Sequence, residues 1–493
     1  MDSVIAAEHL PEAARNERLR RVDWRFLLPL AAEPGDSDLA TPRRPSRAEL
    51  RRAYAALRPG GEVRCEWRLP LPGTAWRARR ALERAGFVDV RLHWAWPAAR
   101  RGGAQFWIPL DAAAAAAHLL RLRSATVNRR QTFARLLWGF TAAAGALAPL
   151  SALARKPDGE PEPVDEIEAA LDVLPGGESR RRGRTWLLLT GGRRSINKVV
   201  GVPFCGSSGV PSLVVKFARV AEAEGGLERE ATVLREIEAA HPTLPGVPRV
   251  LASGRRVGRL AIAETAIHGA PLLSQLDAAT FPQLAAQVTE WLIELAGRRR
   301  PEPREAWWAR LVEAPLDEFE RGFAVAGGDG VVERAREFVA GLPALSPACE
   351  HRDCSPWNIV LAGPGEPALL DWESAEPHGL PGLDLVYFLA NAAFVIEGAL
   401  ESDRTLEAYR RLLDPATGSG RVFARCTARY GDRLGLAPDT LSRLRTLCWV
   451  VHSRSDRRHL EMEAGGAADP QALRASLYFN LLREDLRRRE GGR

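Results

Sequence analysis

The sequence is poor in cysteine, methionine and lysine. Its 493 residues include six cysteines, without CxxC spacing, and two methionines. This pattern excludes a disulfide-stabilised scaffold and, together with the lack of a cleavable apolar leader, predicts a cytoplasmic protein in a reducing compartment. Of the 69 basic residues only three are lysines, Lys156, Lys198 and Lys216, so arginine carries nearly all the positive charge. Each lysine is therefore a candidate for a specific role.

Apolar residues and arginine are abundant. Hydrophobic residues make up 46% of the chain and charged residues 27%, with a formal net charge of +7. The length suggests about two to four compact units with cores of their own, which excludes a disordered or collagen-like chain. The arginine clusters lie close to acidic residues and are not interleaved with aromatic side chains. They predict solvated faces and no nucleic-acid partner, with a phosphate-rich or membrane surface as the alternative.

Residues 1–125 alternate between strand-like and helix-like patterns, which is typical of an α/β layer. The predicted elements are strands at 22–30, 62–70 and 88–96 and helices at 47–58 and 77–86. No glycine-rich turn follows the first strand, although a Rossmann-like cofactor site requires one. The runs ALRPGGEV and LERAGFVDV resemble the last third of a class I S-adenosylmethionine-dependent methyltransferase. The resemblance implies a degenerate, partial Rossmann-like domain without the cofactor site, and the alternative is a structural or docking role.

Residues 126–164 form an apolar segment followed by a linker. Residues 136–154 carry no charged side chain, and as a helix they would measure about 28 Å, near the thickness of a hydrocarbon core. Seven of these residues are alanines and Pro149 interrupts the run, which favours a helix packed on the domain or in a membrane interface over a membrane span. The proline-bearing, polar stretch after it predicts a domain boundary.

Residues 165–267 predict a small antiparallel sheet with one helix, and residues 268–493 predict a helical lobe. Five short runs are rich in β-branched residues, and a segment at 227–240 is apolar at helical spacing. The five runs are 185–190, 197–204, 212–218, 247–253 and 260–267. The helical pattern after about residue 275 is broken by one strand–loop block at 349–372. This order predicts an α+β fold of two lobes.

The strand–loop block contains an ordered set of polar residues. Asp353 and Asn358 stand in the pattern H-x-D-x-x-x-x-N, and Asp371 follows a β-rich run thirteen residues later. Transfer of a phosphoryl group needs a carboxylate that orients and deprotonates the attacking hydroxyl, and oxygen ligands that hold Mg²⁺. We therefore predict Asp353, Asn358 and Asp371 as catalytic residues, with Asn358 and Asp371 as the metal ligands.

This block resembles the aminoglycoside phosphotransferase and choline kinase branch of the protein-kinase-like fold. The loop in that branch usually reads H-G-D-x-x-x-x-N, whereas Arg352 stands here in place of the glycine. The run Asp371-Trp372-Glu373 also fits the branch, as does Asp384, whose counterpart there supports the catalytic loop. The resemblance implies a two-lobe protein-kinase-like fold that uses ATP and Mg²⁺.

The resemblance further implies a lysine on the third strand of the small lobe, paired with a helix glutamate, that binds the nucleotide phosphates. Lys216 has this position, and Glu230 is the expected partner, with Glu228 as the second choice. A lysine in mid-strand between apolar residues is costly unless its ammonium group meets an anion. The alternative is an edge-strand lysine that points to water.

Two further segments are expected to contact ATP. The loop with Gly191, Gly192 and Ser195 allows the backbone to approach phosphates closely. Thr265 and Ala266 fall at the end of the fifth strand, where a hinge between lobes would meet adenine.

The sequence therefore predicts a phosphotransferase that moves the γ-phosphate of ATP to a hydroxyl of a small molecule of the aminoglycoside, sugar or amino-alcohol class. One alternative is a non-catalytic pseudokinase scaffold. Another is a membrane-surface kinase of a lipid-linked sugar, with peripheral membrane contact through residues 136–154. His452 and His459, seven residues apart on one predicted helix, are interpreted as surface or packing residues and not as metal ligands.

Overall fold

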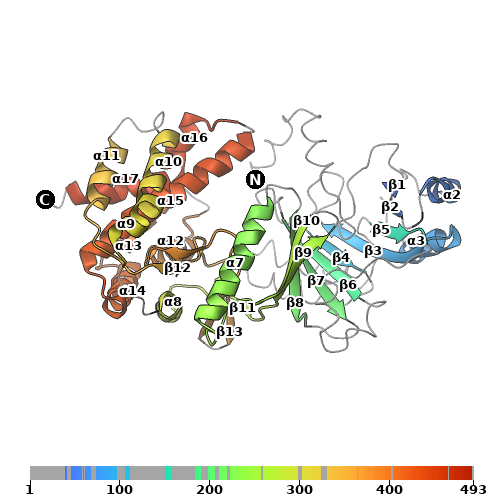
Figure 1. The fold of residues 1–493 in the computed structure, drawn as a ribbon, viewed down its shortest axis with the longest axis horizontal. Coiled ribbons are helices and arrows are strands. Elements are labelled where there is room, and N and C mark those ends of the chain that lie inside the picture. Colours follow the sequence, from blue (N-terminus) through green and yellow to red (C-terminus); the bar gives the residue numbers. More distant parts are fainter. Residues whose placement is uncertain are drawn as a thin grey trace. The chain divides into compact units, whose positions relative to one another are not determined.

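The computed structural model describes two compact units (Figure 1). Unit 1 contains the described residues up to Ala231 together with Arg249–Ala266, and unit 2 contains Thr232–Pro248 and the described residues from Ile267 onward. The described residues are 39–40, 46–57, 59, 61–67, 74–96, 106–110, 150–157, 184–189, 198–205, 210–218, 223–256, 259–297, 302–323, 330–363, 365–400, 404–464 and 466–490.

Unit 1 is built on one ten-stranded sheet with the strand order β1-β2-β5-β3-β4-β6-β7-β8-β10-β9. Its strands are β1 (Leu39–Ala40), β2 (Glu62–Trp67), β3 (Val88–Trp96), β4 (Phe106–Pro109), β5 (Leu150–Arg155), β6 (Arg184–Leu189), β7 (Lys198–Cys205), β8 (Leu213–Ala218), β9 (Val250–Arg256) and β10 (Arg259–Thr265). The described helices in this part of the chain are α2 (Arg47–Ala56), α3 (Thr74–Arg84) and α7 (Glu224–Ala240), and the boundary with unit 2 falls within α7.

The first part of the sheet is mixed, so the predicted Rossmann-like layer is not confirmed. β1 is parallel to β2, and both β2 and β3 are antiparallel to β5, so β1, β2 and β3 run in one direction with α2 and α3 between them in the chain. α2 begins with a capping box, in which the N–H of Glu49 donates to Ser46 Oγ at 3.3 Å. The buried faces of both helices pack on β2, β3 and β5 in one apolar core. The strand predicted at 22–30 lies outside the described residues.

The apolar helix predicted over 136–154 is wrong at its C-terminal end. Residues 150–155 form strand β5, in which Leu150, Ala152 and Ala154 are buried, so alternate side chains face the core as in any strand. The rest of the segment lies outside the described residues. Among the helices that the structure describes, none is long and apolar enough to cross a membrane.

The second part of the sheet confirms the predicted order of five antiparallel strands with one helix. β6 to β10 lie side by side (Figure 1), and α7 falls between β8 and β9 in the chain. Leu227 and Ala231 of α7 pack against a core formed with Ala218 and Ile262. β4 pairs with β6, so strands from residues 1–125 and from 165–267 share one sheet. The sequence does not predict this pairing.

Unit 2 is mainly helical, as predicted. Its helices are η5 (Leu272–Ser274), α8 (Phe281–Ala296), α9 (Arg304–Trp308), η6 (Ala309–Glu313), α10 (Ala314–Phe323), α11 (Val331–Val339), α12 (Leu383–Ile396), α13 (Thr405–Leu412), α14 (Gly418–Leu434), α15 (Pro438–Ala464), α16 (Pro470–Ala475) and α17 (Leu477–Glu490). Two small sheets join β11 (Ala270–Pro271), β13 (Ile359–Gly363) and β14 (Glu366–Leu369), and β12 (Ala348–Glu350) with β15 (Glu376–Gly379).

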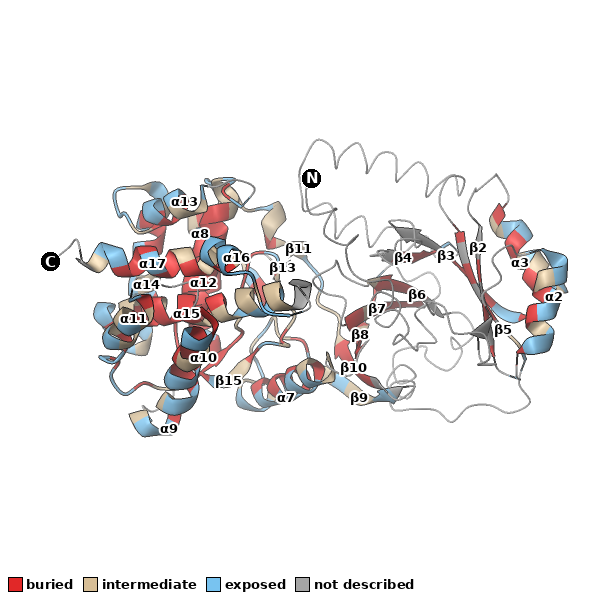
Figure 2. Cartoon of the chain, turned by 90° about the horizontal axis from the view of Figure 1, so that it is seen from above, coloured by how far each residue is buried: buried red, intermediate tan, exposed pale blue. Residues whose placement is uncertain are grey.

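Helix α12 occupies the interior of unit 2. Every residue from Leu383 to Phe394 is buried, and Figure 2 shows the helix in red among its neighbours. A helix that is apolar on nearly all sides is stable only inside a core. Two polar side chains on its first turns, Asp384 and Tyr387, are thereby held in fixed positions.

Candidate active site

The predicted lysine–glutamate pair is present in unit 1. Lys216 Nζ lies 2.5 Å from Glu230 Oε1, and the glutamate is fully buried. Strand β8 places Lys216 opposite Val200 of β7 and Ile262 of β10, so its side chain projects from the middle of the sheet. This geometry excludes the alternative of an edge lysine that points to water.

A second buried carboxylate, which the sequence analysis did not assign to this cluster, meets the same ammonium group. Glu264 Oε2 of β10 lies 3.0 Å from Lys216 Nζ, and its side chain is 1% exposed. Burial and the negative charge of Glu230 raise the pKa of Glu264 to about 7, while Lys216 opposes the rise. Glu264 therefore holds a proton for much of the time near neutral pH.

Thr265 and Ala266, the predicted hinge residues, use their backbone donors within unit 1. The N–H of Thr265 donates to the carbonyl of Arg249 at 2.9 Å, and the N–H of Ala266 donates to the carbonyl of Ser212 at 3.0 Å. Both backbone N–H groups are therefore already used within unit 1. Gly191, Gly192 and Ser195 lie outside the described residues.

Asp353 and Asn358 come together in unit 2. Asn358 Nδ2 donates to Asp353 Oδ2 at 2.8 Å and to the Asp353 carbonyl at 3.0 Å. Both side chains are half-buried, while their neighbours Cys354, Ser355 and Ile359 are buried. The amide thereby fixes one carboxylate oxygen of Asp353.

Asp384 braces this loop, as the resemblance implied. Its Oδ2 accepts the N–H of His351 at 2.6 Å and its Oδ1 accepts the N–H of Arg352 at 2.8 Å. Burial and the nearby Glu350 raise the pKa of Asp384 to about 7, against the effect of these two donors. The two hydrogen bonds determine the course of the backbone directly before Asp353.

Arg352, which replaces the usual glycine, adopts a left-handed backbone with φ of 65°. A glycine is unstrained there, whereas a residue with a Cβ pays a conformational cost. The Arg352 side chain compensates through its contact with the buried Glu350, with Nε 3.3 Å from Oε2. Glu350 is 2% exposed, so it needs this cation nearby.

Asp371 directly follows Leu370, which is hydrogen-bonded to the loop that carries Asp353 and Asn358. The N–H of Leu370 donates to the Asn358 carbonyl at 2.9 Å, and the Leu370 carbonyl lies 3.0 Å from His351 Nε2. Asp371 itself has φ of 71°, a strained value for a residue with a side chain, of the kind found at functional sites. Its neighbour Trp372 is fully buried and packs edge-on against His351.

Sequence reasoning missed Tyr387, which lies next to Asp353, and Tyr478, which is hydrogen-bonded to Tyr387. Tyr387 of α12 has its hydroxyl 3.5 Å from Asp353 Oδ1, and the Tyr478 hydroxyl donates to the Tyr387 oxygen at 3.0 Å. His452 stacks on Tyr387 with ring centroids 3.8 Å apart. The one sequence signal for Tyr387 is its place three residues after Asp384, on the same helix face.

His452 is a buried packing residue and His459 is an exposed surface residue, which agrees with the interpretation of both. Burial lowers the pKa of His452 to about 3. In the described part of the chain, no three His, Cys, Asp or Glu side chains cluster closely enough to hold a metal ion.

Comparison with known proteins shows which part of the chain is similar to phosphotransferases. The model of the phosphotransferase enzyme family matches residues 203–423, and no curated protein matches the chain. A solved structure of a thermostable mutant of aminoglycoside phosphotransferase APH(4)-Ia is 15% identical, with 62% of this chain and 93% of that chain covered and a TM-score of 0.40.

Two other solved structures have similar sequence identity, coverage and TM-score. Aminoglycoside phosphotransferase APH(3'')-Id from Streptomyces rimosus is 16% identical, with 52% of this chain and 89% of that chain covered and a TM-score of 0.35. A choline/ethanolamine kinase family protein from Mesorhizobium loti is 15% identical, with 65% and 94% covered and a TM-score of 0.37.

Proposed function

We propose that the protein transfers the γ-phosphoryl group of ATP to a hydroxyl of a small molecule, in a reaction that depends on Mg²⁺. The observation that carries this proposal is the loop geometry at Asp353. Its carboxylate is held by the Asn358 amide at 2.8 Å, and the backbone before it is braced by Asp384. The family match over residues 203–423 supports the same conclusion.

In the proposed reaction Asp353 orients the acceptor hydroxyl and takes its proton as the oxygen attacks the γ-phosphorus. The bond between the γ-phosphorus and the bridging oxygen breaks, and ADP leaves with the electron pair. Lys216, positioned by Glu230, binds the phosphates, and the loop with Gly191, Gly192 and Ser195 covers them.

The donor set at the end of the β13–β14 hairpin fits Mg²⁺. Asn358 uses its amide hydrogens on Asp353, so its Oδ1 is the atom that it offers to a cation, and Asp371 supplies a carboxylate. Oxygen ligands of this kind are those that Mg²⁺ prefers. Bound Mg²⁺ would neutralise charge on the phosphates and ease the departure of ADP.

We propose further that the first part of unit 1 is a partial methyltransferase-like layer that docks or stabilises and does not bind the cofactor. The parallel run of β1, β2 and β3, with α2 and α3 between them, supports an α/β origin for this layer.

The proposed reaction is tested by a panel of hydroxylated acceptors. Aminoglycosides, sugars and amino alcohols are each incubated with the full chain, ATP and Mg²⁺, and ADP release is measured above the rate without acceptor. We expect stimulation by one class, and its loss when EDTA removes Mg²⁺. A thermal shift with ATP and Mg²⁺ in the parent and in Asp371→Ala gives an independent reading of binding, and we expect the shift in the parent alone. Without stimulation or shift, the pseudokinase alternative is favoured.

A further inference from the structure

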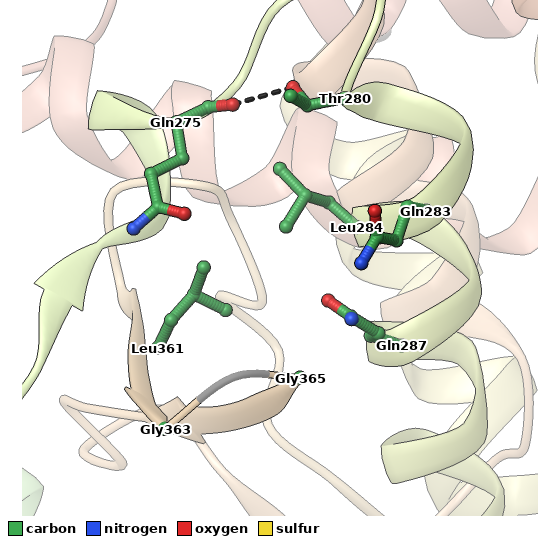
Figure 3. Close-up of a pocket in the computed structure, with 8 residues that line it drawn as sticks. All are labelled: Gln275, Thr280, Gln283, Leu284, Gln287, Leu361, Gly363 and Gly365. Carbon is green, nitrogen blue, oxygen red and sulfur yellow. Dashed lines mark hydrogen bonds between the residues drawn. The ribbon is translucent and has the colours of Figure 1, made fainter.

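A cavity of about 450 Å³ lies in unit 2 at the turn of the β13–β14 hairpin. Figure 3 shows its walls, which come from the loop after η5, from the first turns of α8 and from the hairpin. The lining residues are Gln275, Thr280, Gln283, Leu284, Gln287, Leu361, Gly363 and Gly365. The cavity has the size of a small-molecule site.

The lining is amide-rich and, over the lining residues that the structure describes, uncharged. Gln283 and Gln287 lie one turn apart on the same face of α8, and Gln275 faces them from the other wall (Figure 3). A carboxamide both donates and accepts hydrogen bonds, so three of them match a set of neighbouring hydroxyl groups. Leu284 and Leu361 add an apolar surface, which suits the C–H face of a sugar ring.

The Gln287 side chain places a buried polar atom at the cavity wall. Gln287 Oε1 is buried and has no hydrogen-bond partner within the described residues. Its amide nitrogen lies against the hairpin turn, because a Cβ at Gly365 would be 3.0 Å from Gln287 Nε2. Buried polar atoms in native proteins nearly always have a partner, so an unsatisfied acceptor at a cavity wall calls for a donor from a ligand or water.

The opposite wall is held in place by the chain itself. Thr280 Oγ1 donates to the Gln275 carbonyl at 2.5 Å, drawn as the dashed line in Figure 3. The same hydroxyl accepts the N–H of Asp277 at 3.0 Å. These bonds fix the loop that carries Gln275, so the site is formed before a ligand binds.

The cavity is separate from the candidate active site. Asn358 precedes β13 and Asp371 follows β14, whereas Gly363 and Gly365 lie at the turn. Along the strand, Asn358 lies about 10 Å from Leu361 and about 16 Å from Gly363, so a small ligand centred at the turn lies away from the Asn358 side chain.

From these observations we propose that the cavity is a second ligand site, which takes a neutral polyhydroxylated molecule such as a monosaccharide or a cyclitol. The proposal does not rest on the proposed phosphotransfer.

The test measures whether D-glucose and myo-inositol bind to the full chain. Saturation-transfer NMR detects binding, and a titration in the millimolar range gives the affinity. The parent is compared with the double variant Gln283→Leu/Gln287→Leu and with Gln471→Leu, a control at an exposed glutamine of α16. Loss of two hydrogen bonds predicts binding about ten- to a hundredfold weaker in the double variant and unchanged in the control. If the double variant misfolds, Gln283→Ala, which lies at an exposed helix position, is titrated in its place. We expect it to lose less affinity than the double variant.

Three results would overturn the proposal. The first is that neither neutral ligand binds to the parent. The second is equal binding to the parent and to the double variant, which would place the ligand elsewhere. The third is that glucose 6-phosphate or glucosamine binds more tightly than glucose and that this binding depends on the glutamines. Glucosamine is included because Glu366 lies next to Gly363, outside the lining.

Discussion

The ammonium group of Lys216 lies between two buried carboxylates, which makes the stability of unit 1 dependent on pH. The pKa of Glu264 rises from 4.5 to about 7 on folding, because burial and Glu230 disfavour its charged form. Between these two pH values the folded chain binds more protons at this site than the unfolded chain does. The contribution of protonated Glu264 is therefore fully present below about pH 4.5 and is lost as the pH rises through 7. A shift of this size corresponds to about 3 kcal/mol.

The variant Glu264→Gln has nearly the same shape and does not titrate. We expect the difference in unfolding free energy, variant minus parent, to become more positive by about 3 kcal/mol between pH 4 and pH 8. Urea unfolding followed by circular dichroism at a series of pH values measures this difference. Glu228→Gln, at an exposed position on α7, is the control and is expected to leave the profile unchanged. Parallel profiles for parent and Glu264→Gln would refute the reasoning.

Three other changes test the site in parts. Lys216→Met leaves Glu230 and Glu264 without their shared cation and should destabilise the chain by about 3–5 kcal/mol in urea unfolding; a loss below 1 kcal/mol would argue against the triad. Arg352→Gly removes a cost of about 1–2 kcal/mol from the left-handed backbone, but it leaves Glu350 buried without its cation, at a cost of about 3–5 kcal/mol. Its melting temperature should therefore fall, and a rise would show that backbone strain dominates. Tyr387→Phe removes a hydroxyl next to Asp353 and should lower kcat about two- to tenfold, with the KM for ATP unchanged; a change in that KM alone would contradict the placement.

The order of elements in the second part of unit 1 follows from local patterns, whereas the pairing of Lys216 with Glu230 was expected from the family resemblance. Runs of β-branched residues bounded by Gly, Ser or Pro predict strands well. Glu264 did not appear in the predicted cluster because its contact with Lys216 arises from the pairing of β8 with β10, a relation between distant segments.

Residues 150–155 show the opposite case, in which local preference misleads. Alanine and leucine favour a helix, yet this segment inserts between β2 and β3 and pairs with both. In the structure, alternate residues from Leu150 are buried. In the sequence, the alanines make the alternation of apolar and polar residues too weak to indicate a strand. Tertiary pairing therefore determined the outcome.

The few lysines of this chain have specific, mostly buried surroundings, whereas their scarcity says less about phosphate binding. Lys198 and Lys216 are both buried, and Lys156 donates to the Leu57 carbonyl at 2.6 Å and lies 4.8 Å from the centre of the Tyr54 ring. All three lysines thus have specific surroundings within unit 1. Lys216 lies within 3.0 Å of carboxylate oxygens of both Glu230 and Glu264.

The central claim is that Asp353 acts on the acceptor hydroxyl, and the turnover of Asp353→Asn tests it most directly. With an acceptor that stimulates ADP release from the parent, the variant should be slower by at least about 10²-fold, because general-base catalysis contributes about 10²- to 10⁴-fold. Its affinity for ATP with Mg²⁺ should stay nearly unchanged, since the change spares Asp371 and Lys216. Equal turnover of variant and parent would contradict the account.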